Sequence, residues 1–484
     1  MKCTSIIIAC LISLASFTQT FNKRLNWTNS IYADGRNCFE VNEGYVFFAS
    51  YLDTLKLVKS GCIFTDAEGE ITLEKSVFDD STSLYIGYYG GVDQFDSGFV
   101  SCGNYYTPPY DVVQSATLMY NLSGDTIWTR IYQSPTEDIY LYAALKVEDG
   151  VLACGQSNTD TTPGAGLLLK YDNDGNLLWR KDYLPTTTTD LILVSAVEIP
   201  TGGFLLGGAS LAPFNWNHMI IKTDNEGNQI WRKFQGDEFN NYYAMVGNTA
   251  DGKYIFGGQD KNAEQFEDAS QVTKMNTNGT YAWTQTYGEY GPDCAVFAIK
   301  QMPDGGFILC GGDRSSWSLY GYICRIDADG NQLWYRKYQQ TEGNWGYLSD
   351  VVHTSDNGFL LTGFLESEGE LSQDVWALKL DSLGCLVPGC AVGIIEDGQQ
   401  AAMRIYPNPA DAFINVFVES KNVKDCELHL YDMQGKQIYC TTIRESGNTF
   451  MMDSSSLPAG IYLLHLQLDG VVVKSEKVVV RHGE

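Results

Sequence analysis

Several features that mark common classes of protein are missing from this chain of 484 residues. It has only five histidines and 19% charged residues, and its 59 acidic residues outnumber 32 basic ones. It contains no Gly-x-Ser-x-Gly elbow, no His-Glu-x-x-His helix, no P-loop and no Rossmann glycine pattern. The sequence therefore offers no motif for a serine hydrolase, a zinc protease or a nucleotide-dependent enzyme.

Long apolar runs are also missing, since no stretch approaches the ~20 residues that a transmembrane helix needs. The run from Ile6 to Leu14 follows the positive Lys2 and precedes the small residues Ala15 and Ser16, an order typical of a secretory signal peptide. We expect residues 1–19 to be that signal and the mature chain to have no stable membrane insertion. Ile7 to Cys10 resembles a lipoprotein cleavage box, but cutting there would leave almost no apolar segment.

Positive charge is scarce, and its scarcity limits the partners. The net charge is −27, and residues 403–484 hold 8 basic and 10 acidic residues, so nearly all of the excess falls before them. A field of this sign repels nucleic acid phosphates and anionic lipids, so we expect neither as a partner. The 48 glycines and 30 tyrosines suit a chain of strands and turns.

What is present is a repeat of about 50 residues. Five turn glycines are each followed four positions later by a tryptophan, while Gly69 leads to Leu73 and Gly384 to Pro388. The turn glycines are Gly69, Gly124, Gly175, Gly227, Gly279, Gly330 and Gly384, and the tryptophans are Trp128, Trp179, Trp231, Trp283 and Trp334. A second glycine marker repeats in step with the first, so the chain contains seven units.

Each unit predicts four short strands, as residues 294–338 show best, with Asp329–Gly330 predicting a two-residue type I′ turn. Such units are typical of β-propeller blades. We therefore predict an all-β fold with a seven-bladed β-propeller over residues 22–384; a solenoid or sandwich is the alternative. The seventh unit lacks a fourth strand, and we predict that Trp27 to Tyr32 supplies it and removes an open sheet edge.

Two features of the repeat suggest cofactors, and each has a structural explanation. The Gly-x-x-x-Trp phrase resembles the tryptophan docking motif of pyrroloquinoline-quinone dehydrogenases, where the indole packs one blade on the next, but the adjacent cysteine pair of those enzymes is missing here. The turns at Asp172 and Asp327 echo a calcium loop, but their glycine comes at position four instead of six. We predict no cofactor and no metal.

The C-terminal region carries three motifs in order: Met403-Arg-Ile-Tyr-Pro-Asn-Pro, Leu457-Pro-Ala-Gly-Ile-Tyr and Lys477-Val-Val-Val-Arg. This order resembles the C-terminal sorting domain of bacterial type IX secretion system cargo. The resemblance implies that residues 403–484 engage the type IX machinery, that the chain passes through the periplasm, and that it is secreted or held at the outer cell surface. About seven strand patterns in this region predict a small Ig-like β-sandwich, and residues 385–402 a linker.

Cysteines and histidines supply few candidate sites. Cys385 and Cys390 flank a short loop after the last blade, and Cys426 and Cys440 bracket a hairpin, so both pairs are disulfide candidates in an exported protein. Three histidines fall in the sorting domain. His218 and His353 stand in different blades without ligand spacing, and we interpret each as a structural or surface residue.

Loop lengths give the strongest functional hint, because we expect the first-to-second and third-to-fourth connections to be tight and the others to be longer and grouped on one face. Aromatic and acidic residues collect in those longer loops and suit sugars or protein partners. The ligand-binding candidates are Tyr106, Trp216, Tyr243, Tyr290, Trp317 and Trp345. We favour a non-catalytic glycan- or protein-binding module; the alternative is a glycan-cleaving enzyme with paired carboxylates.

Overall fold

The computed structural model describes residues 19–77, 83–87, 90–106, 113–159, 162–185, 190–211, 216–235, 243–262, 267–291, 294–314, 319–339, 345–366, 373–386, 401–420, 426–432, 436–443, 448–468 and 471–482. This part of the chain forms strands and contains no helix, so it holds no helical segment that could cross a membrane. The chain divides into two units, Met1–Ser195 with Gln340–Pro388 and Ala196–Gln339 with Gly389–Glu484.

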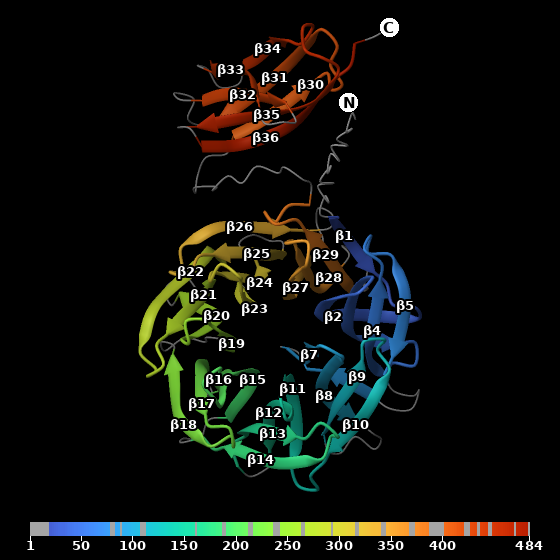
Figure 1. Ribbon diagram of the computed structural model, residues 1–484, viewed down its shortest axis with the longest axis vertical. Coiled ribbons are helices and arrows are strands. Elements are labelled where there is room, and N and C mark those ends of the chain that lie inside the picture. The colour runs from blue at the N-terminus through green and yellow to red at the C-terminus, as the bar shows by residue number, and fades with distance from the viewer. Residues whose placement is uncertain are drawn as a thin grey trace, which may run out of the picture. The chain divides into compact units, whose positions relative to one another are not determined.

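The repeats fold as the seven blades of a β-propeller, each an antiparallel sheet (Figure 1). The prediction of an all-β propeller is confirmed. In chain order the strands are β1 (Phe21–Leu25); blade 1, β2 (Ser30–Val41), β3 (Gly44–Asp53), β4 (Val58–Thr65), β5 (Ile71–Ser76); blade 2, β6 (Ser83–Ile86), β7 (Val92–Phe95), β8 (Gly98–Tyr106), β9 (Gln114–Asn121), β10 (Thr126–Tyr132); blade 3, β11 (Asp138–Val147), β12 (Gly150–Asn158), β13 (Ala165–Tyr171), β14 (Leu177–Tyr183).

The remaining blades keep the same order. They are blade 4, β15 (Asp190–Glu198), β16 (Phe204–Leu211), β17 (Trp216–Thr223), β18 (Gln229–Gln235); blade 5, β19 (Met245–Asn248), β20 (Tyr254–Asn262), β21 (Glu267–Met275), β22 (Tyr281–Gly291); blade 6, β23 (Ala295–Gln301), β24 (Phe307–Asp313), β25 (Tyr320–Ile326), β26 (Gln332–Tyr338); and blade 7, β27 (Trp345–His353), β28 (Phe359–Glu366), β29 (Gln373–Leu380). Blade 2 departs from the four-strand pattern because β6 and β7 both pair with β8.

The turns between third and fourth strands are closed by an acidic or amide side chain three residues before the turn glycine. At Asp327, Oδ1 accepts the backbone N–H groups of Asp329 (2.9 Å) and Asn331 (2.8 Å), and Gly330 has a φ of +88°. The same double cap occurs at Asn121, Asp172, Asp224 and Asp381. A type I′ turn needs positive φ at both central residues, and here the glycine alone has it, so the predicted turn type is wrong.

These contacts also explain the acidic residues that suggested calcium. A carboxylate whose oxygen already accepts two amides of its own turn serves as a backbone cap, since Asp and Asn bond their own backbone in this way. The hydrogen bond to Asn331 lowers the pKa of Asp327, which keeps the cap charged. The acidic turns are therefore structural.

Trp128 and Trp283 each pack one blade on the next. A Cβ built on Gly175 would lie 2.9 Å from the Trp128 ring, and the indole N–H of Trp128 donates to the Asn173 carbonyl at 3.0 Å. Within the second unit, Trp283 lies against Gly330 in the same way. The turn glycine therefore supplies both a positive φ and room for the neighbouring indole.

The chain start completes blade 7, but with different residues from those predicted. Strand β1 pairs antiparallel with β29 over Phe21–Leu25, beginning with Phe21 opposite Lys379. Trp27 instead stacks on Tyr51 of blade 1 at 4.3 Å, and Ser30–Tyr32 begin β2. The prediction of residues 27–32 as the closing strand is wrong because Phe21, which packs against Gly69, performs there the role that tryptophan performs elsewhere.

The C-terminal region is a small β-sandwich. One sheet holds β30 (Ala401–Tyr406), β31 (Phe413–Ser420) and β34 (Asn448–Asp453); the other holds β33 (Gln437–Ile443), β32 (Cys426–Asp432), β35 (Gly460–Leu468) and β36 (Val471–Val480). One hydrophobic cluster joins both sheets, including Ile414 and Val416 from the first and Leu428 and Leu464 from the second. The first strand begins at Ala401, inside the predicted linker, whose residues 387–400 lie outside the described part of the chain, as do residues 1–18.

Candidate functional site

The candidate site is the end of the propeller at which second and fourth strands finish, which we call the long-loop end. In blade 6 the two connections at the opposite end span residues 302–306 and 327–331, while those at the long-loop end span 314–319 and 339–344. The connections at the two ends of this blade therefore differ less in length than the sequence predicted. The clearer difference is that the short turns are capped by their own side chains.

The structure places four of the six aromatic candidates. Tyr106 ends β8 and Trp345 begins β27, both in the first unit; Tyr243 precedes β19 and Tyr290 lies near the end of β22, both in the second. Tyr290 and Trp345 are each 38% exposed, whereas Tyr106 and Tyr243 are half-buried. Trp317 and the side chain of Trp216 lie outside the described residues, so a common site for all six stays a prediction.

Tyr290 forms an aromatic and carboxylate pair with Asp260. The tyrosine hydroxyl donates to Asp260 Oδ2 at 3.0 Å from the neighbouring part of the same blade. Burial and this hydrogen bond raise the pKa of Tyr290, so the hydroxyl stays protonated. A carboxylate has about four acceptor positions and Tyr290 uses one of them, so the pair offers a ring face beside hydrogen-bonding oxygen.

A second aromatic and acidic group lies between blades 2 and 3. Burial, followed by the charge of Asp138, raises the pKa of both Tyr106 and Tyr140. Tyr140 lies parallel to Tyr142 at 6.4 Å between ring centroids, and Asp138 Oδ1 accepts the backbone N–H of Val113 at 2.7 Å. Sequence analysis missed Tyr140 and Tyr142 because they lie within a strand, and loop position was the criterion.

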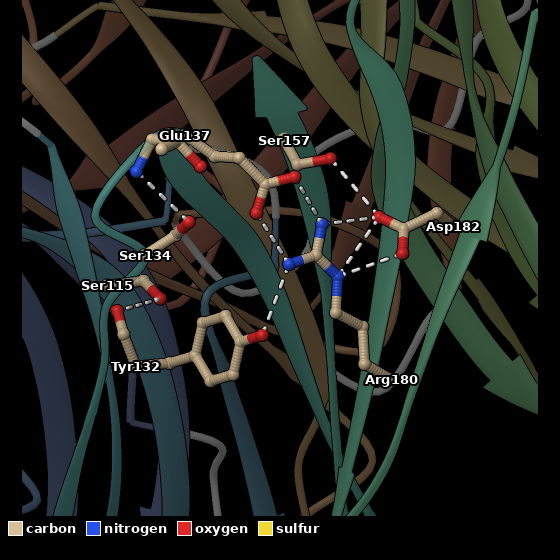
Figure 2. A network of polar contacts seen from close by, with 8 residues as sticks. Ser115, Tyr132, Ser134, Glu137, Ser157, Arg180 and Asp182 are labelled. Carbon is tan, nitrogen blue, oxygen red and sulfur yellow. Dashed lines mark hydrogen bonds and ion pairs between the residues drawn. The ribbon is translucent and has the colours of Figure 1, made fainter. Parts of the chain in front are cut away.

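Arg180 is the centre of a network of polar contacts (Figure 2). Its guanidinium donates to both oxygens of Glu137 at 2.8 and 3.0 Å, to Asp182 at 2.7 Å and to the Tyr132 hydroxyl at 3.1 Å. The hydrogen bond from Arg180 holds the pKa of Glu137 below its usual range. A glycosidase acid needs a raised pKa, so Glu137 suits a clamp between blades 2 and 3 better than catalysis.

Among the described carboxyls, the pKa of Asp34 is raised. Burial is the main cause, and the charge of Arg36, whose Nη2 lies 2.8 Å from Asp34 Oδ2, only partly offsets it. The Arg36 guanidinium also covers the Tyr85 ring at 4.9 Å. Both charged side chains are at most 1% exposed, so the pair has no surface that a substrate could reach. It gives no support to the glycosidase alternative.

The two propeller histidines lie in different blades. His218 is buried, its ring lies edge-on to Phe256 at 5.9 Å, and burial lowers its pKa to about 4. His353 packs on Phe359 in blade 7. Their interpretation as structural residues agrees with these contacts.

The two predicted disulfides have different outcomes. Cys385 is disulfide-bonded, and Cys390 lies outside the described residues, so their pairing stays a prediction. Cys440 has a free, exposed thiol. The predicted bond to Cys426 is wrong because the hairpin register sets Cys440 opposite His429 and Cys426 opposite Ile443, three residues further along the strand.

Comparison with known proteins identifies the C-terminal region. Residues 404–481 match the family described as the secretion system C-terminal sorting domain. No curated protein matches the chain. Similar solved structures include the β-propeller domain of the Trilobed protease from Pyrococcus furiosus, at 8% identity and a TM-score of 0.40 over 73% of this chain and 96% of that chain.

Two further solved structures are similar over most of this chain. The acylaminoacyl peptidase of Pyrococcus horikoshii shows 9% identity and a TM-score of 0.40 over 82% of this chain and 60% of that chain. The WD40 domain of Toxoplasma gondii coronin shows 9% identity and a TM-score of 0.43 over 75% of this chain and 87% of that chain. Residues 404–481 therefore form a secretion system C-terminal sorting domain, which follows the propeller in the same chain.

Proposed function

We propose that this exported protein is a binding module that holds a glycan at the long-loop end of its propeller. The observation that carries the proposal is the pair of Tyr290 and Asp260, in which the hydroxyl of an exposed tyrosine donates to Asp260 Oδ2 at 3.0 Å. Sugars present apolar C–H faces that stack on aromatic rings and hydroxyls that donate to carboxylates. Concave or rigidly held sites of this composition bind small ligands with few but well-placed polar groups.

Charge narrows the class of glycan. Nearly all of the net charge of −27 lies on the propeller side of residue 403, and such a field disfavours acidic polysaccharides. We therefore propose a neutral glycan. Trp345 at the start of β27 is as exposed as Tyr290. We propose that its ring is the sugar-stacking surface of the first unit.

Export supports a role outside the cell. We propose that residues 1–19 direct the chain to the periplasm, that the sorting domain then carries it across the outer membrane, and that the linker is cleaved afterwards. Deleting residues 403–484 should leave the propeller in the periplasm, as cell fractionation would show. A truncated propeller that still reaches the surface would contradict this part of the proposal.

A glycan array tests the binding proposal with the full chain and matched variants. Tyr290→Ala removes ring and hydroxyl, and we expect it to weaken binding at least ~10-fold, about 1.4 kcal/mol. Tyr290→Phe keeps the ring and should retain part of the affinity. Tyr281→Ala is the control, because Tyr281 is 47% exposed on the same strand β22 but at its other end.

The outcomes separate the alternatives. Equal loss in Tyr281→Ala and Tyr290→Ala would contradict a site at the long-loop end. No glycan binding by the unaltered chain would overturn the proposal and favour a protein partner. Release of sugar from a bound glycan would favour the glycosidase.

A further inference from the structure

The sorting domain carries a cluster of potential metal ligands on one face of its four-stranded sheet. Glu427 and His429 project from β32, and Cys440 lies opposite His429 on the adjacent strand β33. One ligand atom from each of the three residues lies within 4.8 Å of the others. We propose that Glu427, His429 and Cys440 bind a zinc-class divalent metal ion.

The distances fit tetrahedral zinc. His429 Nε2 lies 3.1 Å from Glu427 Oε2 and 3.6 Å from Cys440 Sγ. Zinc bonds of about 2.0 Å to nitrogen or oxygen and about 2.3 Å to sulfur place tetrahedral ligands about 3.3 to 3.6 Å apart. The three side chains therefore need little movement to share one ion, and a fourth position stays open to water or to another molecule.

The histidine is held in the tautomer that a metal needs. His429 Nδ1 lies 3.1 Å from Gln437 Oε1, which also accepts the Tyr431 hydroxyl at 3.3 Å. An amide oxygen only accepts, so Nδ1 carries the proton and donates it. The lone pair of Nε2 then faces the Glu427 carboxylate and the Cys440 sulfur. A cation would bind these three electron-rich atoms together. Metal-bound histidines usually donate their second N–H in this way.

The state of Cys440 is the independent observation. It is an exposed free thiol in a chain that is exported, whereas the other free cysteines of the described residues are buried. Exposed thiols tend to oxidise or form disulfides in oxidising compartments. Coordination to zinc would protect this sulfur. His465, opposite His429 on β35, lies beside the cluster and adds a nearby imidazole.

The proposal goes beyond glycan binding and does not depend on it. The test uses the reduced, metal-free full chain titrated with Zn²⁺ by calorimetry, and with Co²⁺ to detect sulfur-to-metal charge-transfer absorption. We expect one ion per chain and slower alkylation of Cys440 when zinc is present. Cys440→Ser should abolish the charge-transfer band, and His429→Ala and Glu427→Gln should each weaken binding at least ~10-fold.

The control is His482→Ala, because His482 is an exposed histidine of the same domain that contacts Asp411 instead of the cluster. It should leave zinc affinity unchanged. Cys440 is exposed, so replacing it by serine should preserve folding, which circular dichroism would check. Zinc binding in Cys440→Ser and His429→Ala as tight as in the unaltered chain, or no protection of the thiol, would overturn the proposal.

Discussion

The ring of Phe21 lies against Gly69, the turn glycine of blade 1. Phe21 belongs to β1, which hydrogen-bonds to β29 of blade 7, so the residue joins the chain start to the last blade and packs that blade on the first. Trp128 makes the equivalent contact with Gly175 between blades 2 and 3. One phenylalanine therefore replaces the repeated tryptophan at the junction of the first and last blades.

Replacing Phe21 by alanine should open this junction. The side chain is 7% exposed, and large-to-small changes of buried phenylalanines cost about 3–5 kcal/mol. We expect a lower midpoint of urea unfolding and faster proteolysis near the chain start. Lys23→Ala on the same strand is the control, since its ion pair with the exposed Glu70 is worth at most about 1 kcal/mol. Equal losses in both variants would contradict the role of Phe21.

The seven turn glycines were enough to predict the propeller because each occupies a position that few other residues can. Gly175 combines a φ of +80° with an indole 2.9 Å from where a Cβ would lie; a positive φ recurs at all seven turn glycines, and the close indole recurs at Gly330. The closing strand could not be predicted in the same way. Phe21 packs against the turn glycine Gly69 in place of a tryptophan. The tryptophan pattern of the repeats therefore indicated Trp27 instead.

The candidate site was less predictable for a physical reason. Loop aromatics such as Tyr290 could be found by composition, but its partner Asp260 lies 30 residues away on another strand. Cys440 and His429 are likewise 11 residues apart and meet only through the register of β32 and β33. Cross-strand neighbours depend on register, which a one-residue shift changes completely, so Cys426 was chosen as the wrong partner.

The buried pair of Asp34 and Arg36 should depend on both members. Arg36→Met would leave the Asp34 carboxyl in the interior without its cation, and breaking such a pair costs about 3–5 kcal/mol. The double variant Asp34→Leu with Arg36→Met removes both charges and should be closer to the unaltered protein. Thermal unfolding of the single and double variants measures the difference. A double variant less stable than Arg36→Met would show that the charges themselves are needed.

The Arg180 network should stabilise the junction of blades 2 and 3 in a pH-dependent way. Arg180→Ala removes charged hydrogen bonds to Glu137 and Asp182, and because these groups are about a fifth to a third exposed we expect a loss of about 1–2 kcal/mol. The folded pKa of Glu137 is lowered, so its contribution is complete above the unfolded value near 4.5 and is lost as the pH falls through the folded value.

Urea unfolding at pH 7 and at acidic pH would test this network. The Arg180→Ala variant should differ most from the unaltered chain at pH 7 and least at the acid end. Lys75→Ala is the matched control, since Lys75 pairs between blades 1 and 2 with Asp125, which is largely exposed. A loss for Lys75→Ala as large as that for Arg180→Ala would attribute the effect to blade junctions in general.

His218 should make the propeller less stable in acid. Its pKa is about 4 in the folded chain against an ordinary 6.5, because burial disfavours the charged ring. Between these values the unfolded chain binds a proton that the folded chain does not, so stability rises as the pH increases from about 4 to 6.5. The gap corresponds to about 3 kcal/mol. His218→Phe removes the titrating ring from its place beside Phe256 and should flatten this part of the pH profile of unfolding, whatever its effect at pH 7.5. If the profile keeps its slope in His218→Phe, the acid sensitivity arises elsewhere, since no other group is changed between the two proteins.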